Sequence, residues 1–214
     1  MRLFEIKIEL IEEVIDNIQY NCSDAIDAYK RSKRVLWRGV RRNKNAPFYK
    51  FGQLLKSHSP EKRKSISVNQ TSETFKIIND ALKTLNFEAR RDNIICCSSD
   101  WVHASHYTSN SALFTNGQLY MIFPINGFNF IWSDKFKDFG GVTTNKLDLV
   151  KMENIDDAQK IISNCGFRKD NFVAALKSGN EIGINGEYIA IGEKYYKRYK
   201  KYFKEILGFN YAII

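Results

Sequence analysis

Several residue types and motifs are scarce in this chain, and their scarcity excludes whole classes of protein. Its 214 residues include only 4 cysteines and 3 histidines, with neither a C-x-x-C pair nor a metal-ligand spacing, so no metal site is predicted. Walker, G-x-G-x-x-G and G-x-S-x-G motifs are also missing, which argues against P-loop enzymes, Rossmann folds and serine hydrolases. No apolar run approaches the roughly 20 residues of a membrane span.

The first residues, Met-Arg-Leu-Phe-Glu, lack the basic start and the uninterrupted apolar run of a signal peptide. We therefore expect a cytoplasmic protein without a membrane partner. Cys96 and Cys97 are adjacent in an apolar run. All four cysteines, including Cys22 and Cys165, are expected to be reduced and buried as small hydrophobes.

Composition and charge indicate the number of domains and the kinds of partner that the surface can attract. Apolar residues make up 43% of the chain and aromatic residues 14%, which is enough for a packed core in a single domain over residues 1–214. The net charge is +9, and much of it lies in residues 30–64 and 194–204. Such a surface can attract nucleic acid, a polyphosphate or an acidic protein, and it is equally typical of a solvated face.

The spacing of apolar residues predicts an α+β fold. Helices are expected over residues 3–18, 23–31, 71–85, 101–107, 155–165, 170–176 and 193–206, and strands over 35–40, 93–97, 119–123, 128–132, 181–184 and 188–191. Residues 41–67 are polar and indicate a long loop. Pro124 and Gly127 predict a turn that pairs the strands within 119–132, and Asn185-Gly186 between apolar runs predicts a β-hairpin.

Three short segments carry residue types suited to chemistry. They are Trp37-Arg38-Gly39, then Cys97-Ser98-Ser99 followed by Ala104 and Tyr107, then Asn180-Glu181-Ile182. Taken alone, each has a purely structural explanation: an arginine in an ion pair, a helix cap in which Asp100 or Ser99 caps the helix over 101–107, and a solvated glutamate. Their order along the chain is more specific than any one of them.

In this order the segments resemble the arginine–serine–glutamate branch of the ADP-ribosyltransferase family, and the small transferases of tailed phages in particular. The resemblance covers about residues 36–191: L-W-R-G-V at 36–40 is similar to the family's first strand, and 181–191 to its glutamate-bearing hairpin. It implies a split β-sandwich core at 33–191, N-terminal helices at 1–32 and a basic C-terminal helix at 192–214. For a phage-encoded chain it implies the host cytoplasm.

The resemblance implies mono-ADP-ribosyl transfer from NAD, and the chemistry explains the residue types. Breaking the nicotinamide–ribose bond passes through an oxocarbenium-like state, which the carboxylate of Glu181 can stabilise as carboxylates do in glycosidases. Arg38 would bind the phosphates and ribose of NAD through its guanidinium fork. Ser98 or Ser99 would hold the rotamer of Glu181.

The same resemblance assigns further residues to NAD and implies no metal ion. An aromatic ring can stack on the departing nicotinamide, and Tyr107, Phe114 and Phe128 are the candidates. The residues assigned to NAD binding are Arg38, Gly39, Cys97, Ser98, Ser99, Tyr107, Phe114 and Phe128. We expect the side chains of Arg38, Ser98 and Glu181 to line one cleft.

Two positions depart from the family pattern. Cys97 stands where the first serine of the tripeptide is usual, so Ser98 or Ser99 takes its role. Gly179 stands two residues before Glu181, where transferases that modify protein side chains usually have Glu or Gln. The acceptor is therefore left open: a macromolecule, with an intracellular protein preferred, a nucleic acid, a small molecule or water.

Two alternatives concern the carboxylate and the activity itself. Glu187 also heads a strand, but Glu181 is preferred because only then do the following strands fall in the family's order. The other alternative is a non-enzymatic basic module on a degenerate transferase fold, which binds nucleic acid or an acidic protein. In that module the C-terminal lysines contact phosphates and the interleaved tyrosines pack or stack. The simplest form of this segment is an amphipathic helix with buried tyrosines and solvated lysines.

Overall fold

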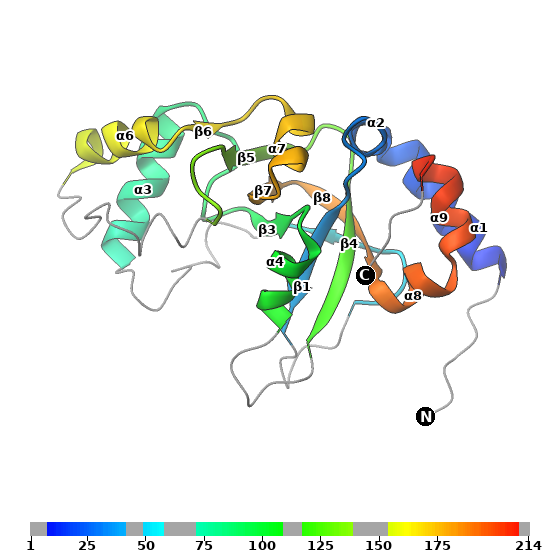
Figure 1. Cartoon of the computed structure of the whole chain (residues 1–214). Helices are drawn as coiled ribbons and strands as arrows, with labels where there is room; N and C mark the ends of the chain where they lie inside the picture. The colour runs from blue at the N-terminus through cyan, green and yellow to red at the C-terminus, as the bar shows by residue number, and fades with distance from the viewer. Residues whose placement is uncertain (1–7, 42–48, 58–71, 109–116, 139–153, 210–214) are drawn as a thin grey trace.

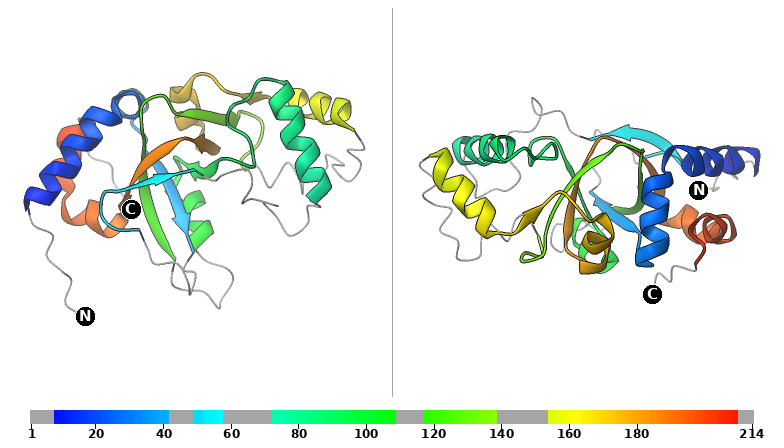
Figure 2. Two further views of the ribbon diagram at one scale, coloured as in Figure 1. Left: turned by 180° about the vertical axis from the view of Figure 1, so that it is seen from behind. Right: turned by 90° about the horizontal axis from the view of Figure 1, so that it is seen from above.

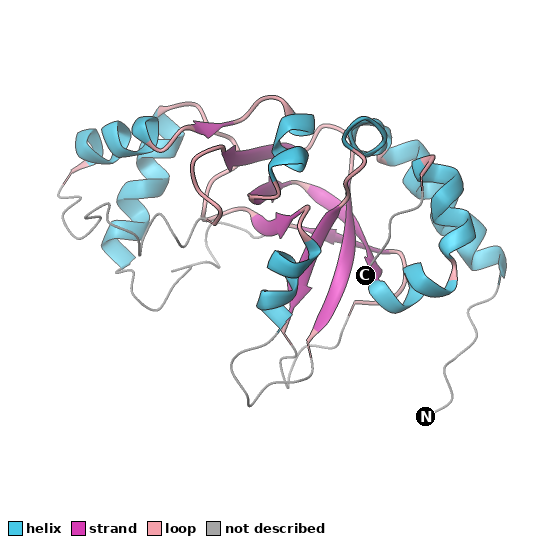
Figure 3. Ribbon diagram, viewed as in Figure 1, coloured by secondary structure: helices cyan, strands magenta, loops and turns pink. Residues whose placement is uncertain are grey.

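The structure, a computed structural model, describes residues 8–41, 49–57, 72–108, 117–138 and 154–209. It confirms a mixed α+β fold, in which helices flank one eight-stranded antiparallel sheet (Figure 1). Figure 3 shows the strands in the middle of the molecule and helices at both ends. Among the described residues, no helix is long and apolar enough to cross a membrane.

The sheet consists of two four-stranded halves. One half has the order β2 (Gln53–Lys56), β8 (Glu187–Gly192), β4 (Gln118–Pro124) and β1 (Leu36–Val40). The other has the order β3 (Ile95–Ser98), β7 (Glu181–Asn185), β5 (Asn129–Ser133) and β6 (Phe167–Arg168). The halves are joined through Trp37 of β1 opposite Ser98 of β3, whereas full ladders join β1 to β4 and β3 to β7. The sheet is therefore divided beside these two residues.

Both turns that the sequence predicts as hairpins carry the chain between the two halves, so both hairpin predictions are wrong. β4 pairs with β1 and β8, while β5 pairs with β7 and β6. β7 pairs with β3 and β5, while β8 pairs with β4 and β2. At the second crossover Gly186 has a φ of 128°, which favours glycine, and its N–H donates to the Ser57 hydroxyl at 3.0 Å.

An edge strand lies within the segment that the sequence predicts as a loop. β2 pairs with β8 from Gln53 through Lys56, and its side chains alternate between half-buried and exposed. Leu54 is 55% exposed, so the strand buries little apolar surface. Periodicity cannot distinguish so short and polar a strand from a loop. The partner strand, β8, also lies far away in the sequence.

The helices from the two ends of the chain pack together at one end of the molecule (Figure 2). They are α1 (Ile8–Asn21), α2 (Ser23–Ser32), α8 (Glu193–Arg198) and α9 (Lys200–Leu207). Both α1 and α2 contact α9, and α1 buries Ile11, Val14, Ile15 and Ile18. The single helix predicted over 193–206 is divided at Tyr199, whose φ of −111° and ψ of 29° are not helical.

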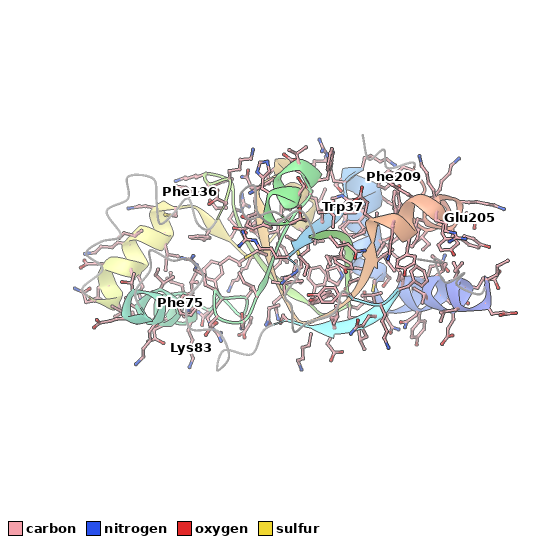
Figure 4. All side chains as sticks on the ribbon, turned by 90° about the horizontal axis from the view of Figure 1, so that it is seen from below. Trp37, Phe75, Lys83, Phe136, Glu205 and Phe209 are labelled. Atoms are coloured by element: carbon pink, nitrogen blue, oxygen red, sulfur yellow. The ribbon has the colours of Figure 1, made fainter. Side chains whose placement is uncertain are left out.

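The opposite end holds α3 (Ser72–Thr84) and α6 (Ile155–Asn164), which pack against each other around their own apolar cluster (Figure 1). Figure 4 shows Phe75 and Phe136 at that end and Trp37 near the middle of the molecule. Between the two ends, α7 (Phe172–Ser178) contacts β5 and α2. The short helices α4 (Trp101–Ser105) and η2 (His106–Thr108) contact β1. These last two helices position the site described next.

Candidate active site

Three neighbouring strands carry the three segments singled out in the sequence. β1 holds Trp37-Arg38-Gly39, β3 ends at Ser98, and β7 begins at Glu181. These strands are adjacent in the sheet, and Ser98 lies opposite Trp37 on one side and Glu181 on the other. Residues far apart in the chain therefore meet where the two halves of the sheet join.

Glu181 is a buried carboxylate at this junction, with 4% of its surface exposed. Its N–H donates to the carbonyl of Lys137 at 2.8 Å, and the hydroxyl of Tyr107 donates to its Oε1 at 3.2 Å. Burial first, and then the Glu181 carboxylate, raise the pKa of Tyr107 well above its usual value. The phenol therefore stays protonated and keeps its role as a donor to the carboxylate.

The turn from β3 into α4 brings Tyr107 to the carboxylate. Asp100 caps α4, as the sequence predicts: its Oδ1 accepts from the N–H groups of Val102 at 2.9 Å and His103 at 3.3 Å. With this cap the helix begins at Trp101, three residues after the last residue of β3. Tyr107 then lies in η2, directly after α4 and against β1.

Gly39 allows β1 to approach α4 and η2 closely. A Cβ atom on Gly39 would lie 2.2 Å from the carbonyl oxygen of Ala104 and 3.0 Å from Cβ of Tyr107. A backbone oxygen within a packed helix cannot move aside as a flexible side chain can, so only glycine fits here. This approach fixes the position of Tyr107.

Ser98 and Ser99 hold the segment that leads into Glu181. The Ser98 hydroxyl donates to the Gly179 carbonyl at 2.8 Å, and the Ser99 hydroxyl donates to the Leu176 carbonyl in α7. Within the described part of the chain, Ser98 makes no hydrogen bond to the Glu181 carboxylate, a contact that η2 provides instead. Ser98 thus supports the backbone before the glutamate rather than its rotamer.

The backbone explains why glycine stands two residues before Glu181. Gly179 follows α7 with a φ of 73° and a ψ of 0°, in the left-handed region. This conformation suits glycine and costs another residue about 1 kcal/mol. An acceptor-binding side chain of the usual kind would be strained at this position.

His103 belongs to the site, although the sequence analysis did not single it out. It is 7% exposed, and its ring lies against that of Tyr107 with centroids 5.8 Å apart and planes inclined by 37°. Its Nδ1 is buried without a hydrogen-bond partner among the residues that the structure describes. The i, i+4 spacing of His103 and Tyr107 is the sequence signal that could have found this pair.

Arg38 lies apart from Glu181. Side chains alternate along a strand, so Arg38 and Trp37 leave β1 on opposite faces, and the strand register gives Trp37 the same face as Ser98 and Glu181. Arg38 instead lies opposite Tyr120 of β4. The structure brings Ser98 and Glu181 together and does not bring Arg38 to them.

Tyrosine hydroxyls and cysteine thiols lie near enough to Arg38 to change its pKa. Burial acts to lower the pKa of Arg38, but Tyr188, Tyr49 and Cys97 raise it overall. Its Nε and Nη1 are buried and have no hydrogen-bond partner among the described residues. Arg38 as a whole is half-buried, and a buried donor without a partner is unfavourable, so these two nitrogens are available to an anionic group.

The other predicted site residues that the structure describes lie in different parts of it, and only Cys97, next to Ser98 in β3, is near Arg38. Cys97 is a buried free thiol whose pKa is raised by burial. Phe128 comes just before Asn129, the first residue of β5, and Asn129 lies opposite Asn185 at the end of β7. Phe128 is therefore at the opposite end of β7 from Glu181. Glu187, the rival carboxylate, is exposed and lies opposite Lys56 at the edge of the sheet. Phe114 lies outside the described residues.

Fold and site together define a mixed α+β protein in which a buried glutamate heads a strand at the junction of a divided antiparallel sheet. Comparisons with protein-family models, with curated proteins and with solved structures find no match to this chain. Among the described residues, no group of three or more His, Cys, Asp or Glu side chains could hold a metal ion. The side chains around Glu181 are therefore the basis for inferring a function.

Proposed function

We propose that this protein is a mono-ADP-ribosyltransferase, with a split β-sandwich of the transferase type, which transfers ADP-ribose from NAD to a macromolecular acceptor. The observation that carries the proposal is the placement of Glu181. Its buried carboxylate heads β7 beside Ser98 and accepts a hydrogen bond from Tyr107. All three residues belong to the segments whose order resembles the transferase family.

The chemistry requires a negative charge held beside the ribose of NAD. As the bond between nicotinamide and ribose breaks, positive charge develops on the ribose, and the Glu181 carboxylate opposes it. Nicotinamide leaves with the electrons of the broken bond, and a nucleophile of the acceptor attacks the anomeric carbon and loses its proton to solvent. The Tyr107 hydroxyl holds one carboxylate oxygen and so fixes the orientation of the carboxylate.

Some of the proposed roles rest on contacts seen in the structure, and others rest on the family resemblance. The bond-breaking step is assigned to Glu181, with Tyr107 and Ser98 as positioning residues. Arg38 lies apart from these residues, so its assignment to the phosphates of NAD rests on the resemblance and on its two free donors. The acceptor class, with an intracellular protein preferred, rests on the resemblance alone.

Nicotinamide release by the full chain, measured with and without candidate protein acceptors, tests the proposal directly. Release that requires NAD and increases with an acceptor supports transfer, and release without an acceptor shows hydrolysis by the same site. If neither NAD binding nor nicotinamide release is detected, the proposed function is wrong.

Removing the Tyr107 hydroxyl should slow the reaction without unfolding the protein. In Tyr107→Phe the carboxylate loses a donor worth about 1.5 kcal/mol, so we expect kcat to fall about tenfold with little change in KM for NAD. The matched control is Tyr20→Phe, because Tyr20 is 83% exposed. Equal kcat for Tyr107→Phe and the parent would remove Tyr107 from the positioning role.

The basic surface of α8 and α9 favours a second candidate, a non-enzymatic module that binds nucleic acid. Tyr196 and Phe203 are buried there, while the lysines and the arginine of both helices are exposed. The exposed cations are Lys194, Lys197, Arg198, Lys200, Lys201 and Lys204. Such a surface can neutralise phosphates, and it can also be a solvated face of packed helices.

Charge reversal on this surface separates the two candidates. If the protein is a transferase, replacing Lys197, Lys200 and Lys201 together by Glu should leave nicotinamide release within about twofold of the parent, because these side chains lie outside the site. If it is a binding module, the same change should abolish nucleic-acid binding, which in the parent should weaken steeply with salt. Nicotinamide release and nucleic-acid binding across a salt series are the two measurements.

A further inference from the structure

A cavity of about 640 Å³ lies between α2, the start of β5 and α7, away from the candidate active site. We call it the phenylalanine pocket. Its lining residues are Asp24, Asp27, Ala28, Arg31, Phe128, Phe130, Asn171, Phe172 and Val173. The lining thus combines three phenyl rings with three charged side chains.

Three mutually inclined rings form the apolar part of the pocket. Phe128 and Phe130 are two residues apart at the start of β5, so they project to the same side, and Phe172 comes from α7. The Phe172 ring centroid lies 5.0 Å from that of Phe128 and 4.9 Å from that of Phe130, with planes inclined by 68° and 55°. All three side chains are only half-buried. All three rings line the cavity and remain partly accessible from it.

Acidic side chains lie at the rim of the same cavity. Asp24 and Asp27 are exposed and three residues apart on α2, so they share one face of that helix. Arg31 follows one turn later and also lines the cavity. None of the three makes an ion pair with a residue that the structure describes. In a chain of net charge +9, this rim has a surplus of one negative charge.

The walls of the pocket are held in place before any ligand binds. Asn126, in the turn before Phe128, donates to the Ser23 hydroxyl at 2.9 Å and accepts from the Asp24 N–H at 3.0 Å. Asn171 caps α7 by accepting from the Ala174 N–H at 3.1 Å. The turn before β5 is thus tied to α2, and the start of α7, from which Phe172 projects, is fixed by its own cap.

We propose that the phenylalanine pocket binds a compact organic cation, such as an ammonium group with apolar substituents. The faces of aromatic rings attract a cation, and apolar substituents fill the space between rings that cannot hydrogen-bond. The carboxylates of Asp24 and Asp27 would attract a cationic ligand but not a neutral one. The proposal does not depend on the proposed transferase activity, because the pocket lies at the other end of β7 from Glu181.

Calorimetric titration of the full chain with choline tests the charge requirement. The control ligand is the uncharged isostere of choline in which carbon replaces the quaternary nitrogen, since it has nearly the same shape. We expect choline to bind about three- to thirtyfold more tightly than the isostere. Equal affinities, or no binding of choline at millimolar concentration, would overturn the proposal.

Variants of the full chain locate the binding and separate its causes. Asp27→Asn should weaken choline binding several-fold and leave the isostere unaffected, whereas Arg31→Gln should strengthen choline binding because it removes a repelling cation. Phe130→Leu keeps the apolar bulk but removes one ring face, so it should lower the preference for choline over the isostere. Choline binding that is unchanged in all three variants would place the site elsewhere and overturn the proposal.

Discussion

Glu181→Gln is expected to reduce nicotinamide release from NAD by about a hundredfold while the protein stays folded. The glutamine preserves the shape of the side chain but removes the charge that opposes the oxocarbenium-like state. Electrostatic stabilisation of this kind is worth on the order of 3 kcal/mol. Steady-state release of nicotinamide, with the unfolding midpoint as a measure of folding, checks both parts of the prediction.

Glu187→Gln is the matched control for this experiment. It makes the same chemical change on the next strand along the chain, at an exposed carboxylate opposite Lys56 of the edge strand β2. We expect its activity to equal that of the parent protein. Full activity in Glu181→Gln together with a loss in Glu187→Gln would show that the catalytic carboxylate is the second one.

Gly39→Ala is expected to destabilise the protein strongly, by about 3 kcal/mol. The new Cβ would lie 2.2 Å from the Ala104 carbonyl oxygen, so β1 and α4 must separate. Because Tyr107 follows α4 and holds the Glu181 carboxylate, activity should fall as well. Denaturant unfolding measures the loss of stability as a lower midpoint.

Gly208→Ala provides a comparison in which the backbone is unfavourable but space is free. Gly208 ends α9 with a φ of 68°, and a Cβ there would meet no atom within 4 Å. Its substitution should cost only about 1 kcal/mol, from the left-handed backbone alone. A loss in Gly39→Ala no larger than this would mean that β1 and α4 can separate easily.

The helices were largely predictable because their signals are local. The apolar spacing of Ile11, Val14 and Ile18 identifies the buried face of α1 without reference to any other part of the chain. Asp100 caps α4 as predicted, because a cap needs only the next three residues. The end of a helix is less certain from sequence, and the division at Tyr199 left no clear signal.

Strand pairing was not predictable from the same local signals. The Asn185-Gly186 turn forms, but the strands beside it pair with β3, β5, β4 and β2 rather than with each other. A turn residue reports the conformation of its own backbone. The choice of partner depends on which apolar faces can be buried together across the whole sheet, and a turn does not contain that information.

In the candidate site too, some features could be predicted from the sequence and others depend on the tertiary structure. The order of the three motifs predicted that Ser98 and Glu181 belong together, and the register of β3 and β7 places them opposite each other. The hydrogen bond from Tyr107 to Glu181 could not be read from spacing, because it depends on how closely β1 lets η2 approach. The separation of Arg38 from Glu181 follows from the alternation of side chains across paired strands.

The sequence by itself determined the α+β class, most helices, the cap of α4 and the residues that could supply a catalytic carboxylate. All of these follow from contacts within a few residues or from side-chain chemistry. Only the tertiary structure decided which strands pair, that Tyr107 donates a hydrogen bond to Glu181, and that Phe128 lines a separate pocket with Phe172. Those outcomes depend on the register and close packing of segments far apart in the chain, which no local pattern specifies.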